Sequence, residues 1–87
     1  MKDKLIINIL EYLKNCDDKM DFIDPNKLLK MSDNSKNVIY TLRELIDRGY
    51  IDSQQIKIST DGYIVPSNMH RPILTESGLA YLEENTK

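Results

Sequence analysis

Apolar residues recur at helical spacing near the N-terminal end of the chain. The stripe consists of Leu5, Ile6, Ile9, Leu10 and Leu13. This spacing places the apolar side chains on one face and predicts an amphipathic helix over residues 2–15. The Asp-rich stretch over 15–21 predicts a solvated loop. Phe22 and Ile23 are then expected to return to the core.

A short second helix is predicted to begin at Asp24-Pro25. An Asp at the N-cap accepts a backbone N–H, and a Pro in the first turn has no donor left without a partner. We expect this helix to end near Met31. Residues 32–35, with the sequence Ser-Asp-Asn-Ser, favour a turn, so the chain is expected to break there and restart.

A third helix is predicted from about residue 35 to Arg48. Its apolar face consists of Val38, Ile39, Leu42, Leu45 and Ile46. Gly49 takes the left-handed conformation at low cost and marks the end of the helix.

The spacing changes to alternation after this helix. Ile56 and Ile58 flank Lys57, and Asp61-Gly62 offers a tight turn before the apolar run at 63–65, which predicts a hairpin. A polar loop follows, after which the apolar pair at 73–74 is expected to return to the sheet.

A last helix is predicted over 75–85. Thr75 can cap it, and Leu79 and Leu82 are expected on its inner face.

Composition and charge restrict the function. The chain has 87 residues with a formal net charge of −2, and its estimated isoelectric point of 5.3 argues against a strongly basic nucleic-acid binder. When the chain is divided at residues 32, 50, 53 and 73, only the segment 54–73 carries more basic than acidic residues. A nucleic-acid surface would therefore need local segregation of charge, and its affinity would depend strongly on salt.

Catalytic, metal and cofactor chemistry find little support. Cys16 is the single cysteine and His70 the single histidine, and we find no Gly-rich phosphate loop and no metal-ligand spacing. We expect no enzyme activity, no cofactor and no metal. One cysteine also fits a reducing compartment, so a cytoplasmic location is expected. No apolar run approaches the roughly 20 residues that span a bilayer, so we expect no membrane insertion.

Two segments resemble bacterial winged-helix proteins. The stretch YTLRELIDRGYI at 40–51 looks like the end of a recognition helix, and ILTESGLAYL at 73–82 looks like the helix that follows a wing. The MarR and PadR transcriptional regulators carry both features. The small size and short first helix also resemble the compact YjcQ-like winged-helix proteins of prophages.

The resemblance implies an α+β fold of the winged helix-turn-helix type, with a three-helix core, a β-hairpin wing and a C-terminal helix. We expect one domain over 1–87, with the helix-turn-helix at about 25–48, the wing at about 54–74 and the C-terminal helix at about 75–85. The function implied is transcriptional regulation through duplex DNA, bound by the third helix and the wing. A single half-site contact by a nearly neutral domain would be weak, so we expect a homodimer. The alternative is a non-catalytic module whose winged-helix surface docks a protein partner.

The expected DNA contacts are polar and basic side chains on the third helix, the turn before it and the wing. They are Lys30, Ser35, Lys36, Asn37, Tyr40, Thr41, Arg43, Lys57, His70 and Arg71. Asn37 can bond adenine, Lys36 can reach guanine acceptors or a phosphate, and Arg71 can enter a minor groove. The same residues could instead serve as helix caps or as ordinary solvated side chains.

Overall fold

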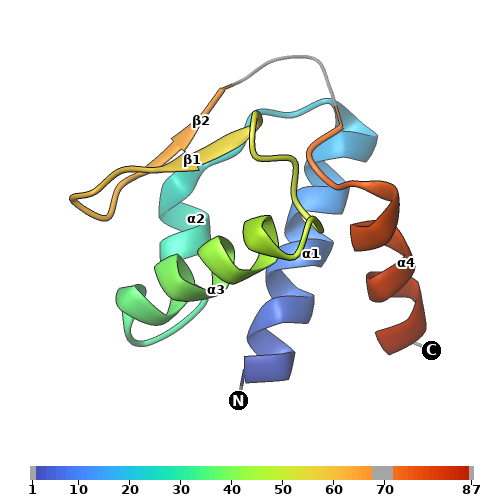
Figure 1. Ribbon diagram of the computed structural model, residues 1–87, viewed down its shortest axis with the longest axis horizontal. Helices are drawn as coiled ribbons and strands as arrows, with labels where there is room; N and C mark the ends of the chain where they lie inside the picture. Colours follow the sequence, from blue (N-terminus) through green and yellow to red (C-terminus); the bar gives the residue numbers. More distant parts are fainter. Residues whose placement is uncertain (1, 68–71, 87) are drawn as a thin grey trace.

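The computed structural model describes residues 2–67 and 72–86, and places four helices and a two-stranded antiparallel hairpin along this part of the chain (Figure 1). The elements are α1 (Lys2–Lys19), α2 (Pro25–Leu29), α3 (Ser35–Asp47), β1 (Ile56–Ile58), β2 (Ile64–Pro66) and α4 (Glu76–Asn85). The predicted α+β class is confirmed, and the order of elements is consistent with a winged-helix-like layout.

The core forms around α1, which contacts α3 and α4 (Figure 1). Its largest fully buried side chains are Ile9, Leu10, Leu13, Leu28, Val38, Leu42, Leu45, Ile51 and Ile56. Burying each aliphatic side chain of this size contributes about 1.5–3 kcal/mol. The core therefore fixes the position of α3 through one apolar face and leaves its opposite face in solvent.

Helix α1 continues beyond its predicted end. Cys16 is buried, with 5% of its surface exposed, because it extends the apolar stripe by one more turn. The helix then ends in a left-handed residue, Met20, with φ of 56°, and the N–H of Asp21 donates to the carbonyl oxygen of Cys16 at 2.9 Å. The loop predicted over 15–21 was therefore placed too early.

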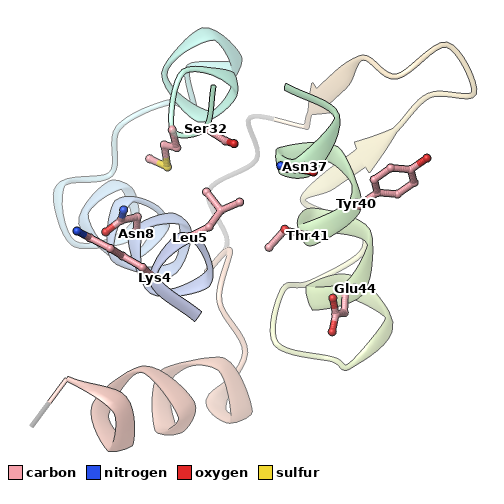
Figure 2. A pocket seen from close by; sticks show the side chains of 9 residues that line it. Lys4, Leu5, Asn8, Ser32, Asn37, Tyr40, Thr41 and Glu44 are labelled. Carbon is pink, nitrogen blue, oxygen red and sulfur yellow. The ribbon is translucent and has the colours of Figure 1, made fainter. Parts of the chain in front are cut away.

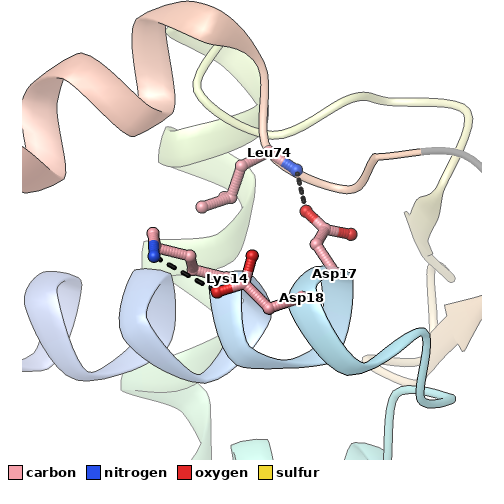
Figure 3. Close-up of polar contacts among 4 residues, drawn as sticks. All are labelled: Lys14, Asp17, Asp18 and Leu74. Carbon is pink, nitrogen blue, oxygen red and sulfur yellow. Dashed lines mark hydrogen bonds and ion pairs between the residues drawn. The ribbon is translucent and has the colours of Figure 1, made fainter.

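Asp17 is not the solvated residue that the sequence suggested. Its carboxylate accepts the N–H of Ile73 at 2.8 and 3.0 Å. It also accepts the N–H of Leu74 at 3.2 Å (Figure 3). Asp18, one residue further on, forms an exposed pair with Lys14 at 3.2 Å. Asp17 thus connects the end of α1 to the segment that enters α4.

The junction after α1 brings one further correction. Ile23 is buried as predicted, but Phe22 is 68% exposed. Only Ile23 of this pair therefore reaches the core.

The ends of α2 and α3 follow the predicted capping signals. The side chain of Asp24 accepts the N–H of Asn26 at 3.0 Å, and that of Asn34 accepts the N–H of Lys36 at 3.0 Å. Gly49 follows α3 with φ of 80°. A short turn therefore separates α2 from α3, as expected.

The hairpin pairs Ile56 with Pro66, Lys57 with Val65 and Ile58 with Ile64. Gly62, with φ of 86°, lies in the loop that connects the strands. The segment predicted to return to the sheet makes only an isolated bridge, between Leu74 and Ile51.

Helix α4 is held by the chain that leaves α3. Thr75 accepts the N–H of Gly78 at 3.1 Å, and the rings of Tyr50 and Tyr81 stack with centroids 4.9 Å apart. Leu82 is buried as predicted, but Leu79 is 36% exposed. The side of α4 that meets the core therefore carries Gly78 and Leu82. No helix within residues 2–67 and 72–86 has the length and apolar character required to cross a membrane.

Candidate functional site

The solvent-facing side of α3 carries most of the residues predicted to contact DNA. Ser35, Lys36 and Asn37 in its first turn are exposed, and Tyr40, one turn later, is 65% exposed. Val38, Leu42 and Leu45 anchor the helix on its opposite side. The first two turns of α3 therefore present polar and aromatic groups to solvent.

Thr41 does not belong to this surface. Only 5% of its surface is exposed. It lies three residues after Val38 and four before Leu45, which places it on the same helix face as the core residues. The structure therefore places Thr41 among the core-facing residues of α3 and not with the exposed polar residues of its first turns.

Arg43 connects α3 to the hairpin. Its Nη2 donates to the carbonyl oxygen of Ser59 at 3.4 Å, in the loop between β1 and β2. Lys57, at the centre of β1, is exposed beside its partner Val65. The hairpin thus brings a lysine to the same region of the molecule as α3, and β2 contacts α2 (Figure 1).

Acidic residues interrupt the C-terminal half of α3. Glu44 pairs with Arg48 at 2.6 Å, and Asp47 is exposed. Asp47 follows Lys36, Tyr40 and Arg43 at the alternating spacing of four and three residues that marks one helix face. The cationic end of this face is therefore its N-terminal end, nearest the turn.

The remaining predicted contacts lie elsewhere. Lys30 caps the C-terminal end of α2 and is exposed. Asp33 in the turn and Asp61 at the hairpin tip are exposed acids. His70 and Arg71 lie outside the described residues.

A pocket that sequence reasoning missed lies beside this surface. It is lined by Asn37, Tyr40 and Thr41 of α3 and by Lys4, Leu5 and Asn8 of α1, and of these Leu5 and Thr41 point toward each other across the gap between the helices (Figure 2). The only trace in the sequence is the placement of Lys4 and Asn8 one turn apart beside the apolar stripe. That spacing could not show that α3 would lie opposite.

The shifted pKa values belong to another part of the molecule. Burial raises the pKa of the Cys16 thiol above its ordinary value, despite a hydrogen bond to Tyr12 that acts in the opposite direction. Burial also raises the pKa of Tyr12, whose hydroxyl accepts the N–H of Asp24 at 2.9 Å. The hydroxyl of Tyr12 thus connects α1 to the residue that caps α2. In the part of the chain that the structure describes, no three His, Cys, Asp or Glu side chains gather as a metal site.

Comparison with protein families identifies the family of this chain. The family model described as YjcQ protein matches residues 7–87. No curated protein and no solved structure matches the chain. The predicted resemblance to YjcQ-like proteins is confirmed, whereas the resemblance to MarR and PadR regulators stays a prediction. With nearly its whole length matched, the chain belongs to the YjcQ protein family.

Proposed function

We propose that this YjcQ family member is a non-catalytic winged helix-turn-helix regulator of bacterial or prophage origin, which binds duplex DNA through α3 and the β1–β2 hairpin. The observation that carries the proposal is the link between Arg43 and Ser59. It attaches the hairpin to a helix whose first turns expose Lys36, Asn37 and Tyr40. A helix with polar residues at its exposed N-terminal end can enter a major groove while an adjacent hairpin contacts the backbone.

The charges assign different roles to these residues. Lys36, Lys57 and Lys30 are exposed cations suited to phosphate contacts, which give affinity without sequence preference. Asn37 presents a side-chain amide that can bond both N6 and N7 of adenine. We expect the lysines to supply most of the affinity and Asn37 to supply base preference.

A second candidate function is docking of a protein partner on the same face. Asp47 and the exposed rings of Tyr40 and Tyr63 favour it, because an acidic and aromatic surface suits a polypeptide better than phosphates. In this case the binding partner would carry a basic surface.

Fluorescence anisotropy with a labelled random-sequence duplex tests the proposal. Wild type, Lys36→Ala and Lys14→Ala are compared at two salt concentrations. Lys14 is the matched control, because it removes the same charge from α1, where it pairs with Asp18. We expect weak binding that falls steeply with salt, a loss in Lys36→Ala and no change in Lys14→Ala.

Base readout is tested separately. Selection from a random duplex library identifies a preferred site, and Asn37→Ala is then expected to cost about 1–3 kcal/mol at one base pair of that site. Equal affinity of wild type and Asn37→Ala for every duplex contradicts base readout by Asn37. No binding of the wild type at low salt contradicts DNA binding and leaves protein docking as the better account.

A further inference from the structure

The pocket between α1 and α3 has the size of a small-molecule site. Its volume is ≈ 790 Å³, within the range of about 300–1,000 Å³ typical of ligand pockets. Leu5 and Thr41 point into it from opposite walls, and Ser32 lies at one end (Figure 2). Met31 is also part of the lining. The pocket therefore combines an apolar interior with polar groups at its edges.

The charge available to a ligand is positive. Lys4 is exposed and, among the side chains that the structure describes, takes part in no ion pair. The one carboxylate in the lining, that of Glu44, is neutralised by Arg48 at 2.6 Å. The α1 side of the pocket thus favours one anionic group, and a compact ammonium binds a phosphate well.

Two amides are among the lining residues, one from each helix. Asn8 lies on α1 and Asn37 on α3, and neither side chain forms a hydrogen bond with the described residues. Each amide holds a donor and an acceptor side by side in one plane. This arrangement matches the edge of a nucleobase, as in the pairing of Asn with adenine.

The apolar residues suit the faces of the same ring. Leu5 and the thioether of Met31 offer soft, polarisable contacts to a flat aromatic group. Lys4 supplies a single unpaired ammonium. The pocket therefore neutralises one phosphate group better than a di- or triphosphate. We infer that it binds a nucleoside monophosphate, with the base between Asn8 and Asn37 and the phosphate beside Lys4.

Occupation of the pocket has a consequence for α3. Asn37 and Tyr40 line the pocket and also belong to the surface proposed for DNA. A bound nucleotide would engage the amide that is needed for base readout, so nucleotide and duplex compete. This coupling rests on the proposed function, whereas nucleotide binding itself does not.

The test is an NMR titration of the ¹⁵N-labelled full chain with adenosine 5′-monophosphate, adenosine, inorganic phosphate and a single-stranded oligoadenylate. We expect the monophosphate to shift the side-chain amides of Asn8 and Asn37. Lys4→Ala should lower the affinity for the monophosphate by about fivefold, which is the effect of losing a solvent-exposed ion pair. It should leave the affinity for adenosine unchanged. Lys14→Ala should match the wild type.

Two variants separate this inference from DNA binding. Asn8→Ala should lose nucleotide affinity and keep duplex affinity, whereas Lys36→Ala should do the reverse. Shifts outside the pocket, equal binding of phosphate and monophosphate, or no response to Lys4→Ala and Asn8→Ala would overturn the inference. Binding of the oligoadenylate without binding of the monophosphate would also overturn it, because the ligand would then be a strand rather than a free nucleotide.

Discussion

The contact between Gly78 and Tyr50 predicts that a substitution favourable to helices will destabilise this one. A Cβ added at Gly78 would lie 2.2 Å from the carbonyl oxygen of Tyr50 and 3.0 Å from its carbonyl carbon. Both atoms belong to the backbone, so no side-chain rotation can relieve the clash. Gly78→Ala must therefore displace the start of α4 from the chain that leaves α3.

The displacement costs identifiable interactions. The carbonyl oxygen of Tyr50 also accepts the N–H of Thr75 at 3.1 Å, a hydrogen bond with a net value of about 1 kcal/mol. Stacking of Tyr50 on Tyr81 contributes about 1 kcal/mol more, and residual overpacking adds about 1 kcal/mol. Alanine gains about 1 kcal/mol in helix propensity over glycine. The net loss is about 2 kcal/mol, or a fall in Tm of about 10 °C for a domain of this size.

Urea denaturation followed by circular dichroism measures this change. Ala80→Gly is the matched control, because Ala80 is exposed on the same helix and reports helix propensity without the contact. We expect both variants to lose stability, with Gly78→Ala losing more. If Gly78→Ala instead raises the free energy of unfolding by about as much as Ala80→Gly lowers it, helix propensity alone explains both changes. The close approach of Gly78 to Tyr50 is then refuted.

Three further predictions concern α1. Asp17→Asn removes the charge and one acceptor from the carboxylate that binds two N–H groups, so urea denaturation should show a loss of about 1–3 kcal/mol. Asp18→Asn, at an exposed pair, should change stability by less than about 0.5 kcal/mol. Because burial raises the pKa of Cys16 above its ordinary 9.0, its contribution to stability is complete below that pH and is lost as the pH rises through the folded-state pKa. The free energy of unfolding should therefore fall more steeply above pH 9.0 in wild type than in Cys16→Ala, and parallel profiles would contradict this reading. Met20 holds a left-handed φ of 56° with its side chain 71% exposed, so Met20→Gly should gain about 1 kcal/mol in thermal melts, whereas Met20→Ala, which keeps the Cβ, should not.

The features predictable from the sequence are those set by a few adjacent residues. Asp24-Pro25 begins α2 and Gly49 follows the end of α3 because a cap depends on the local backbone and one side chain. Asp61-Gly62 marks the hairpin loop for the same reason. The exposed start of α3, with Lys36, also followed from helical periodicity alone.

The features that were missed depend on contacts between distant segments. Thr41 is polar, but its position between core residues of α3 buries it. Asp17 is oriented by Ile73, far along the chain. The pocket requires α1, the turn after α2 and α3 to come together, and no local pattern encodes that arrangement.

The salt dependence of DNA binding tests whether locally clustered lysines contact phosphates although the chain as a whole is acidic. The exposed lysines near the proposed interface are Lys30, Lys36 and Lys57, while Arg43 already donates to Ser59. Three phosphate contacts would give a slope of log affinity against log salt of about −2.7 for one copy, and two copies on one duplex would give about −5. A chain with a net charge of −2 cannot produce either slope through its overall charge, so a slope in this range requires the local segregation of lysines. A slope near zero with measurable binding would mean that these lysines do not contact phosphates, and the proposed orientation of α3 on DNA would be wrong.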